Sequence, residues 1–277
     1  YQNNNASQLA ILTDGIYNNI DFTVNTLDNQ TSLLNTLSGL NLTYFKRAPS
    51  QLFDKDAKSL NQRVAKNVSN SNKDFVTITY QVIAPPHSQL YVSIPNISWS
   101  DDNNHSLSIT VNGVTKNQVT DNTFDFFDLG YFETESMVTI KLSFPGNKAI
   151  SFDNPSFYAL DTQNYQIAMD TINERDSKVT TSNNKVFVDY SSKTNASLFF
   201  TIPYDKGWTA TINHKKVKIQ RAQKGFMKVD VPSGKGKVVL TFIPYGLKTG
   251  SLISLLASII FCCYAYFIRK TTIIQKS

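Results

Sequence analysis

Short runs in which apolar and polar residues alternate fill the middle of the chain. In residues 76–82 the apolar side chains occupy every second position, and Pro85-Pro86 then ends the run. Similar runs follow at residues 90–94, 107–111, 124–132 and 138–144. Alternation with a period of two is typical of half-buried strands, and Asn112-Gly113 is typical of a two-residue hairpin turn. The pattern predicts a first β-sandwich or jelly-roll module over residues 74–160.

A second set of alternating runs predicts another β-module over residues 185–246. Both modules contain a strand that ends in proline, at Pro95 and Pro203, followed a few residues later by Trp99 and Trp208. The segments 76–80 and 186–190 also match, at an offset of about 109 residues. Chance agreement between alternating strands is the alternative, but shared landmarks in the same order favour an internal repeat.

Helical periods lie outside these modules. Leucines three and four residues apart predict a short amphipathic helix that ends near Gly39, within a polar N-terminal segment over residues 1–73. A weaker helical period runs from Leu9 to Ile20, and residues 52–72 suggest a connector with one helical turn. Residues 161–184 are expected to form a helical linker.

The C-terminal run is apolar on every face. Residues 247–268 contain a single charge, Lys248, and about 20 apolar residues suffice for a helix to cross a bilayer. We therefore expect a transmembrane helix over residues 247–270, with Tyr264 and Tyr266 near the interface. Three basic residues, Arg269, Lys270 and Lys276, lie beyond the apolar run 247–268, and one, Lys248, lies at its start. This asymmetry predicts a cytoplasmic tail at 271–277 and an extracytoplasmic location for residues 1–246.

The start of the chain bears on this topology. The sequence begins at Tyr1 without an apolar signal segment, so it contains no element to bring residues 1–246 across a membrane. We expect a fragment of a longer protein with further spans. A tail-anchored cytoplasmic protein is the alternative.

The net charge of +6 is unevenly distributed. Residues 1–202 carry 14 basic and 19 acidic side chains, residues 203–246 carry nine and two, and residues 247–277 carry four and none. A basic module beside a membrane suggests anionic lipid or a phosphate-rich envelope polymer as partner, rather than nucleic acid. A solvated basic face is equally compatible. The two cysteines, Cys262 and Cys263, both lie in the apolar run, and an exported region without cysteine favours a bacterial surface.

Sequence motifs for catalysis, metals or cofactors are absent. The chain contains no phosphate-binding loop, no nucleophile elbow and no metal-ligand spacing of Cys and His. His87, His105 and His214 are expected in solvated turns or loops. The acidic segments 101–104 and 121–125 have oxygen ligands suited to Ca²⁺, but such loops are mostly ordinary turns. We assign no catalytic residue, metal site or cofactor.

Two neighbouring segments are candidate contact sites. Aromatic faces beside a carboxylate could bind a sugar, and the alternative is a tight turn with packed aromatic rings. The residues concerned are Tyr204, Asp205, Lys206 and Trp208. The following hairpin gathers positive charge that could face lipid phosphate, a polyanion or water. Its basic residues are Lys215, Lys216, Lys218, Arg221 and Lys224.

Five segments follow one another in the C-terminal part, at residues 202–208, 215–216, 225–227, 232–236 and 244–248, and the last runs into the apolar span. In these segments and their order the chain resembles the YfhO-like family of bacterial membrane proteins. The resemblance is specific over about residues 198–268 and looser over 29–197. His214 stands where a turn glycine is common in the family, which affects only the expected turn geometry.

The resemblance implies a polytopic protein with a glycosyltransferase-C-like architecture. Such proteins are associated with adding sugars to envelope polymers such as lipoteichoic acid from a lipid-phosphate-linked sugar. Their catalytic carboxylates are expected upstream, so this part would hold acceptor or donor without performing chemistry. The alternative is a non-catalytic, membrane-anchored module that binds carbohydrate or wall polymer.

Overall fold

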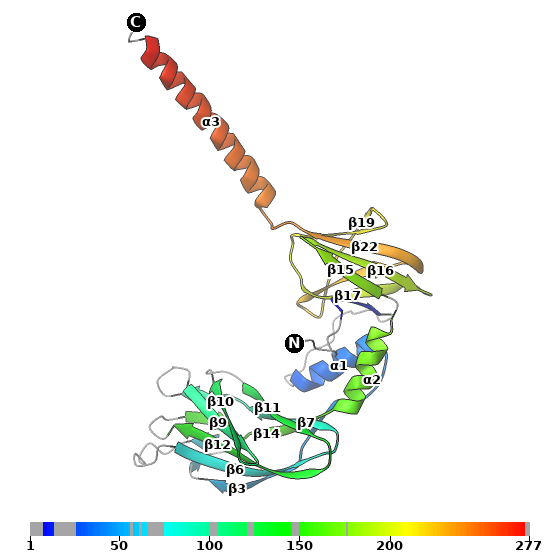
Figure 1. The fold of residues 1–277 in the computed structure, drawn as a ribbon, viewed down its shortest axis with the longest axis vertical. Coiled ribbons are helices and arrows are strands. Elements are labelled where there is room, and N and C mark those ends of the chain that lie inside the picture. The colour runs from blue at the N-terminus through cyan, green and yellow to red at the C-terminus, as the bar shows by residue number, and fades with distance from the viewer. Residues whose placement is uncertain are drawn as a thin grey trace. The chain divides into compact units, whose positions relative to one another are not determined.

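The chain folds into two compact units (Figure 1). The first comprises residues 22–35 and 40–170, and the second comprises residues 1–21, 36–39 and 171–277. Each unit contains two main antiparallel sheets, which confirms the prediction of a mainly β fold. The computed structural model describes residues 8–13, 26–55, 58–60, 63–65, 75–99, 105–120, 125–145, 150–175 and 177–274.

Two sheets enclose the core of the first unit. One sheet has the order β10 (Val114–Thr120), β9 (His105–Val111), β12 (Ser136–Pro145), β6 (Phe75–Ala84), β3 (Ser50–Lys55). The other has the order β11 (Asp125–Phe132), β7 (Ser88–Ile94), β14 (Ser156–Asp161), β2 (Phe45–Arg47). A small sheet adds β4 (Lys58–Leu60), β5 (Arg63–Ala65), β13 (Ile150–Asp153) and β8 (Ser98–Trp99). The alternation in the sequence explains the core, because Leu90, Val92 and Ile94 of β7 all point into it and are fully buried.

The second unit also has two sheets around one core. One has the order β15 (Ser177–Ser182), β16 (Lys185–Ser192), β22 (Gly234–Phe242), β18 (Trp208–Ile212), β19 (Lys215–Val217). The other has the order β1 (Ala10–Thr13), β17 (Ala196–Pro203), β21 (Phe226–Val231), β20 (Gln220–Ala222). Leu198 and Phe200 from one sheet and Val238 and Leu240 from the other are fully buried in this core.

The main sheets of the two units share most of their strand order. The order β10-β9-β12-β6-β3 in the first unit matches β19-β18-β22-β16-β15 in the second. In the other sheets, β11-β7-β14 matches β21-β17-β1. The pairs β6 with β16 and β7 with β17 are those that the repeated sequence segments predict. The common topology therefore supports an internal duplication.

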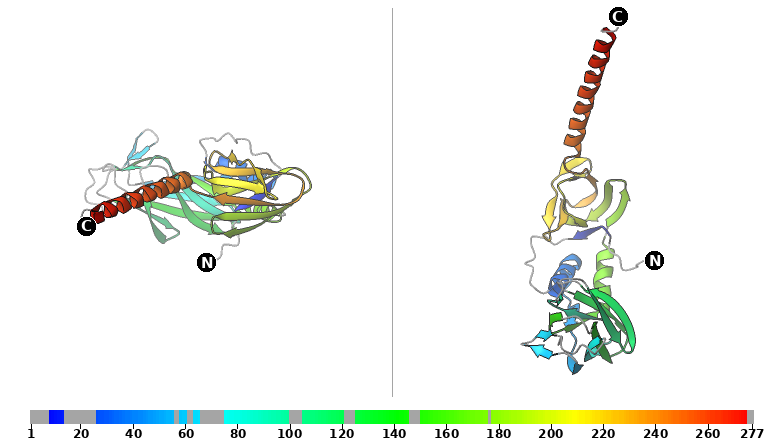
Figure 2. Two further views of the ribbon diagram at one scale, coloured as in Figure 1. Left: turned by 90° about the horizontal axis from the view of Figure 1, so that it is seen from above. Right: turned by 90° about the vertical axis from the view of Figure 1, so that its left-hand side faces the viewer.

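Three helices complete the described structure. Helix α1 (Thr26–Ser38) ends where Gly39 adopts a φ of +75°, as expected for a helix stopped by glycine. Helix α2 (Thr162–Asn173) follows β14. Helix α3 (Leu247–Ile274) is continuous in both views of Figure 2. Its segment Leu247–Tyr266 has a mean hydropathy of 1.7 and no buried residue, so it is a candidate membrane span, as predicted.

Several local predictions differ from the structure. Leu9 and Leu12 do not begin a helix, since β1 occupies residues 10–13. Residues 52–72 contain β4, β5 and the end of β3 where one helical turn was expected. The predicted linker ends in β15, and His105 begins β9 instead of lying in a loop. Ile16, Ile20, the acidic segments at 101–104 and 121–124, and the end of the tail at 275–277 lie outside the described residues.

Candidate functional site

The turn at residues 204–208 is held to the end of β22. Within it, the N–H of Gly207 donates to Asp205 Oδ1 at 2.6 Å, and the N–H of Trp208 donates to the Asp205 carbonyl at 3.2 Å. The carbonyl of Gly207 accepts a hydrogen bond from the N–H of Ile243 at 3.0 Å. A Cβ at residue 207 would collide with Phe242 and with the Ile243 carbonyl, so this close approach requires glycine.

The aromatic rings of this turn have neighbours on their faces. The Arg221 guanidinium lies 4.7 Å from the centre of the Tyr204 ring, and the Trp208 ring lies 4.9 Å from that of Phe242. Both rings are half-buried. The Lys206 ammonium is 5.9 Å from the centre of the Tyr245 ring. These contacts fit the tight-turn interpretation better than an open sugar-stacking surface.

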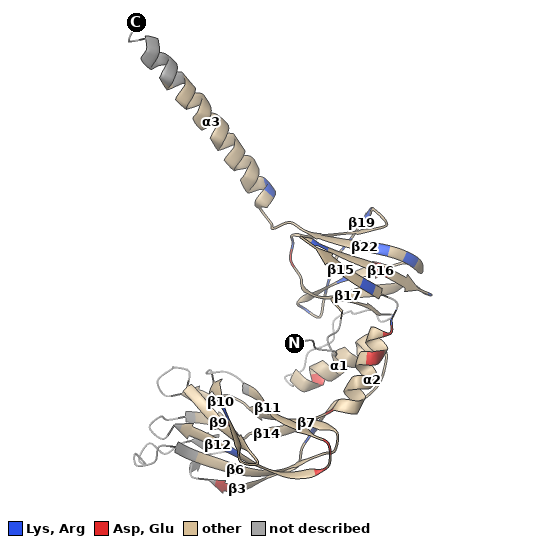
Figure 3. Cartoon of the chain, viewed as in Figure 1, with Lys and Arg blue, Asp and Glu red and all other residues tan. Residues whose placement is uncertain are grey.

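The basic residues of the hairpin follow one edge of the second unit. Lys215 and Lys216 belong to β19, which is the edge strand of one sheet. Arg221 belongs to β20, the edge strand of the other sheet. Lys218 lies between these strands, and Lys224 lies in the turn after β20 with a φ of +57°. All five side chains are exposed, and we call them the basic edge. Figure 3 marks further basic positions along β22.

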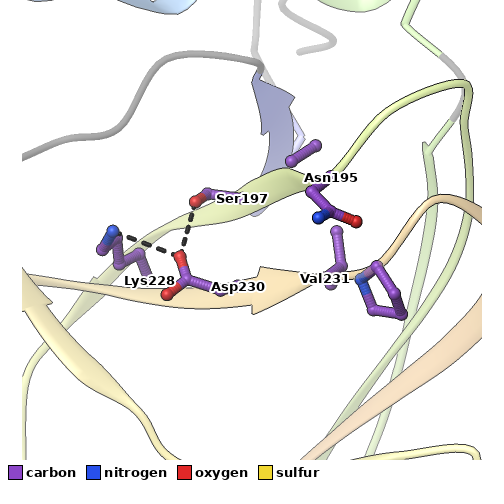
Figure 4. Close-up of a pocket in the computed structure, with 7 residues that line it drawn as sticks. Asn195, Ser197, Lys228, Asp230 and Val231 are labelled. Carbon is purple, nitrogen blue, oxygen red and sulfur yellow. Dashed lines mark hydrogen bonds and ion pairs between the residues drawn. The ribbon is translucent and has the colours of Figure 1, made fainter.

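A cavity in the same unit, lined by both polar and apolar residues, was not predicted from the sequence. It has a volume of about 360 Å³ and is lined by β17 and β21 residues, including Ser197, Lys228 and Asp230 (Figure 4). The Lys228 side chain is only 3% exposed, and its ammonium lies 3.1 Å from Asp230 Oδ1. Asp230 also accepts hydrogen bonds from Ser197 Oγ at 2.7 Å and from Gln220 Nε2 at 2.5 Å. The carboxylate of Asp230 therefore neutralises the buried ammonium group of Lys228.

Burial and hydrogen bonding shift the pKa of Asp230 in opposite directions. Burial alone would raise the pKa of this carboxyl. The hydrogen bonds from Ser197, Lys228 and Gln220, together with the charge of Lys228, outweigh burial and hold the pKa below its usual value. The sequence gives little indication that Lys228 is buried, because Lys228 and Asp230 alternate with apolar residues as any two solvent-facing residues of a strand would.

The described residues show no group of three or more His, Cys, Asp or Glu side chains that could hold a metal. Of the histidines, His87 Nδ1 lies 3.2 Å from Glu133. His105 packs against Trp99, with 4.7 Å between ring centres, and His214 lies in the β18–β19 turn. None of these arrangements resembles a catalytic pair.

A comparison with protein families assigns the chain. The family described as "Bacterial membrane protein YfhO" matches residues 1–254. The chain belongs to the YfhO family. This confirms the resemblance carried by the C-terminal segments, and together with α3 it supports association with a membrane.

One curated relative of this YfhO-family chain is a much longer protein. It is the "Uncharacterized protein YfhO" of Bacillus subtilis (strain 168), which is 25% identical over 141 residues. The aligned part covers 48% of this chain and 16% of the relative. The chain therefore spans only a small part of that relative's length.

Solved structures offer distant similarity to this YfhO-family chain. A family two carbohydrate esterase from Cellvibrio japonicus is 12% identical with a TM-score of 0.23, over 40% of this chain and 34% of the esterase. A CBM22 tandem domain from Paenibacillus barcinonensis is 11% identical with a TM-score of 0.28, over 72% of this chain and 86% of that domain. Scores this low do not establish a common fold or a common function.

Proposed function

We propose that this chain is the extracytoplasmic, membrane-proximal part of a YfhO protein that takes part in glycosylating a cell-envelope polymer of the lipoteichoic-acid type. Sugar transfer from a lipid-phosphate-linked donor would take place elsewhere in the whole protein. The described part would hold a phosphate-bearing chain or head group. The observation that carries the proposal is the basic edge.

The short chain segment between β22 and α3 keeps the turn at residues 204–208 close to the start of the candidate membrane span. The N–H of Ile243 donates a hydrogen bond to the carbonyl of Gly207 in the turn, and Ile243 lies four residues before Leu247, where α3 begins. Because an extended residue spans at most about 3.6 Å, Ile243 lies within roughly 14 Å of the start of the helix, and the turn is hydrogen-bonded to Ile243. Lys206, which belongs to the turn, thus lies near the membrane surface if α3 spans the bilayer.

The charge of the region suits an anionic partner. Residues 203–246 have nine basic and two acidic side chains, and Lys248 adds a positive charge at the start of α3. Exposed lysines attract polyanions over about a Debye length, and salt weakens this attraction. Phosphate is the shared chemistry of a teichoic-acid chain and of an anionic lipid head group, so an experiment must separate the two sources.

The test uses the full chain in nanodiscs. Binding of soluble lipoteichoic acid is measured in zwitterionic nanodiscs over a salt titration, and docking to the bilayer is measured separately in nanodiscs with anionic lipid. The test variant converts Lys215, Lys216, Lys218 and Lys224 to glutamate. The matched control converts Lys178, Lys185, Lys235 and Lys237 of the same unit, which lie outside the basic edge.

We expect the basic-edge variant to lose polymer binding, while the control retains most of it. Loss of docking to anionic bilayers with intact polymer binding would assign the edge to lipid phosphate. Equal losses of polymer binding in both variants would show that binding depends on net charge and not on the basic edge. Absence of binding by the unmodified chain at low salt would overturn the proposal.

A further inference from the structure

We propose that the first unit carries a saccharide-binding groove on the outer face of the sheet β11-β7-β14-β2, built around Phe126 and Tyr158. This site is separate from the basic edge. It deepens the proposed function, on which it rests for the relevance of a sugar ligand, by naming the part of the chain that would bind the sugar.

The groove is large enough for one or two sugar rings. Its volume is about 690 Å³, and it lies between strand residues and the first turns of α1. Its lining combines aromatic faces with hydrogen-bonding groups. The polar residues around it include Gln30, Arg47, Ser93, Asn96 and Ser156.

Three aromatic rings form a row on this face of the sheet. The strand register places Tyr158 opposite Tyr91 and places Phe126 opposite Ser93. Tyr91 and Phe126 are stacked, with 5.0 Å between ring centres and 18° between planes, and Phe126 and Tyr158 are 6.4 Å apart. The Arg47 guanidinium lies 5.7 Å from the centre of the Tyr158 ring. All three rings are half-buried, and Phe126 and Tyr158 line the groove with the part of their apolar surface that stays accessible.

The duplicated fold provides an internal comparison. The repeat aligns Tyr91 with Phe199, and the corresponding strands β11 and β21 supply Phe126 and Phe226 as the neighbouring rings. Phe199 and Phe226 also form a pair, with 5.6 Å between ring centres. However, Phe199 is 1% exposed and packs as an interior residue. Tyr91 therefore keeps part of its ring accessible, whereas its counterpart Phe199 is buried.

The chemistry of the groove matches a pyranose. One face of a pyranose ring presents C–H groups that pack on an aromatic ring, while its hydroxyl groups need donors and acceptors at the rim. Ser93, Ser156 and Gln30 provide both kinds of group, and Arg47 provides donors. Asn96 is held in place, since its Nδ2 donates to Asp153 Oδ2 at 2.6 Å. Fixed polar groups beside a flat apolar face favour a cyclic polyol over a linear one.

The experiment measures binding of methyl glycosides of glucose, galactose and N-acetylglucosamine to the full chain in detergent. Saturation-transfer difference NMR detects contact, and titration gives the dissociation constant, expected to be roughly millimolar for a single ring. Sorbitol serves as a linear polyol with similar hydroxyl groups. The variants are Phe126→Ala, Phe126→Tyr and Arg47→Gln, and Tyr131→Ala is the control, because Tyr131 is an exposed aromatic residue of the same strand that does not line the groove.

We expect at least one glycoside to bind about tenfold more weakly to Phe126→Ala, with binding retained by Phe126→Tyr and by Tyr131→Ala. Arg47→Gln changes an exposed side chain and is expected to fold, so a weaker affinity in this variant would locate the ligand even if Phe126→Ala is unstable. Failure of every glycoside to bind, binding of sorbitol equal to that of the glycosides, or unchanged affinity in both groove variants would overturn the proposal. The basic-edge glutamate variant should retain glycoside binding, so failure of the polymer-binding proposal remains distinguishable from failure of the groove.

Discussion

Asn112 and Asn213 make the same pair of hydrogen bonds in the two copies of the fold. Asn112 Oδ1 accepts from the N–H of Thr139 at 3.0 Å, and the Asn112 N–H donates to the Thr139 carbonyl at 3.0 Å. Asn213 makes both bonds with Lys237, each at 2.9 Å. Both asparagines have a φ of +46°. The turn after β9 is thus tied to the central strand β12, and the turn after β18 to the central strand β22, by one residue type in one backbone conformation.

Replacing either asparagine with alanine should destabilise its unit. The change removes a side-chain hydrogen bond and places a Cβ-bearing residue without a polar side chain in the left-handed region, which together cost about 1–3 kcal/mol. Asn213→Gly should cost less than Asn213→Ala, because glycine tolerates the backbone and loses only the hydrogen bond. Denaturant unfolding of the full chain in detergent measures both. Equal stability of the glycine and alanine variants would contradict this account.

Gly207→Ala should weaken the connection between the turn and β22. The added methyl group would meet Phe242 and the Ile243 carbonyl, and such overpacking costs about 1–3 kcal/mol. Gly250→Ala is the matched control, because its added Cβ meets nothing within 4 Å beyond its chain neighbours and the backbone of its own helix, and alanine favours a helix. Thermal unfolding should therefore show a lower midpoint for Gly207→Ala and no loss for Gly250→Ala. A similar midpoint in both variants would show that the turn can move away from β22.

The sequence predicted the elements whose patterns are local. The turn chemistry of Asn112-Gly113 and the alternation of β7 suffice to define a hairpin and a core face. Strand β1 could not be predicted in this way. Its residues are buried on both faces, so they do not alternate, and its partner β17 lies almost 190 residues further along the chain. Only the tertiary structure shows that the N-terminal segment completes the second unit.

The candidate sites also differ in whether a local sequence pattern could predict them. The basic edge is visible in the sequence because its lysines lie within ten residues of one another. The groove of the first unit combines residues from α1, β2, β7, β11 and β14, and a pattern along the chain does not bring these together. Lys228 was missed for a different reason, since period-two alternation distinguishes the faces of a strand but cannot show that both faces are covered.

The pair Lys228 and Asp230 should respond unequally to mutation. Asp230→Asn leaves an ammonium group that is 3% exposed without its anionic partner, and an unsatisfied buried charge costs at least about 1–3 kcal/mol. Lys228→Met keeps the apolar stem and leaves a carboxylate that is 55% exposed and open to water, so the loss should be smaller. Asp189→Asn is the control for an exposed pair, because Asp189 lies 3.6 Å from Lys237 with both side chains more than half exposed. Denaturant unfolding of the three variants at neutral pH tests the order, and a greater loss in Lys228→Met than in Asp230→Asn would contradict it.

The same carboxylate predicts how stability depends on pH. The pKa of Asp230 is lower in the folded chain than in the unfolded chain, where it is about 3.9. Its contribution is therefore present above the unfolded pKa and is lost as the pH falls through the folded pKa. The difference in unfolding free energy between the unmodified chain and Asp230→Asn should be constant above about pH 5 and should shrink as the carboxylate becomes protonated. Denaturant unfolding of both proteins from pH 7 to about pH 3 measures this difference. A difference that stays constant over the whole range would show that folding does not favour the ionised form of Asp230.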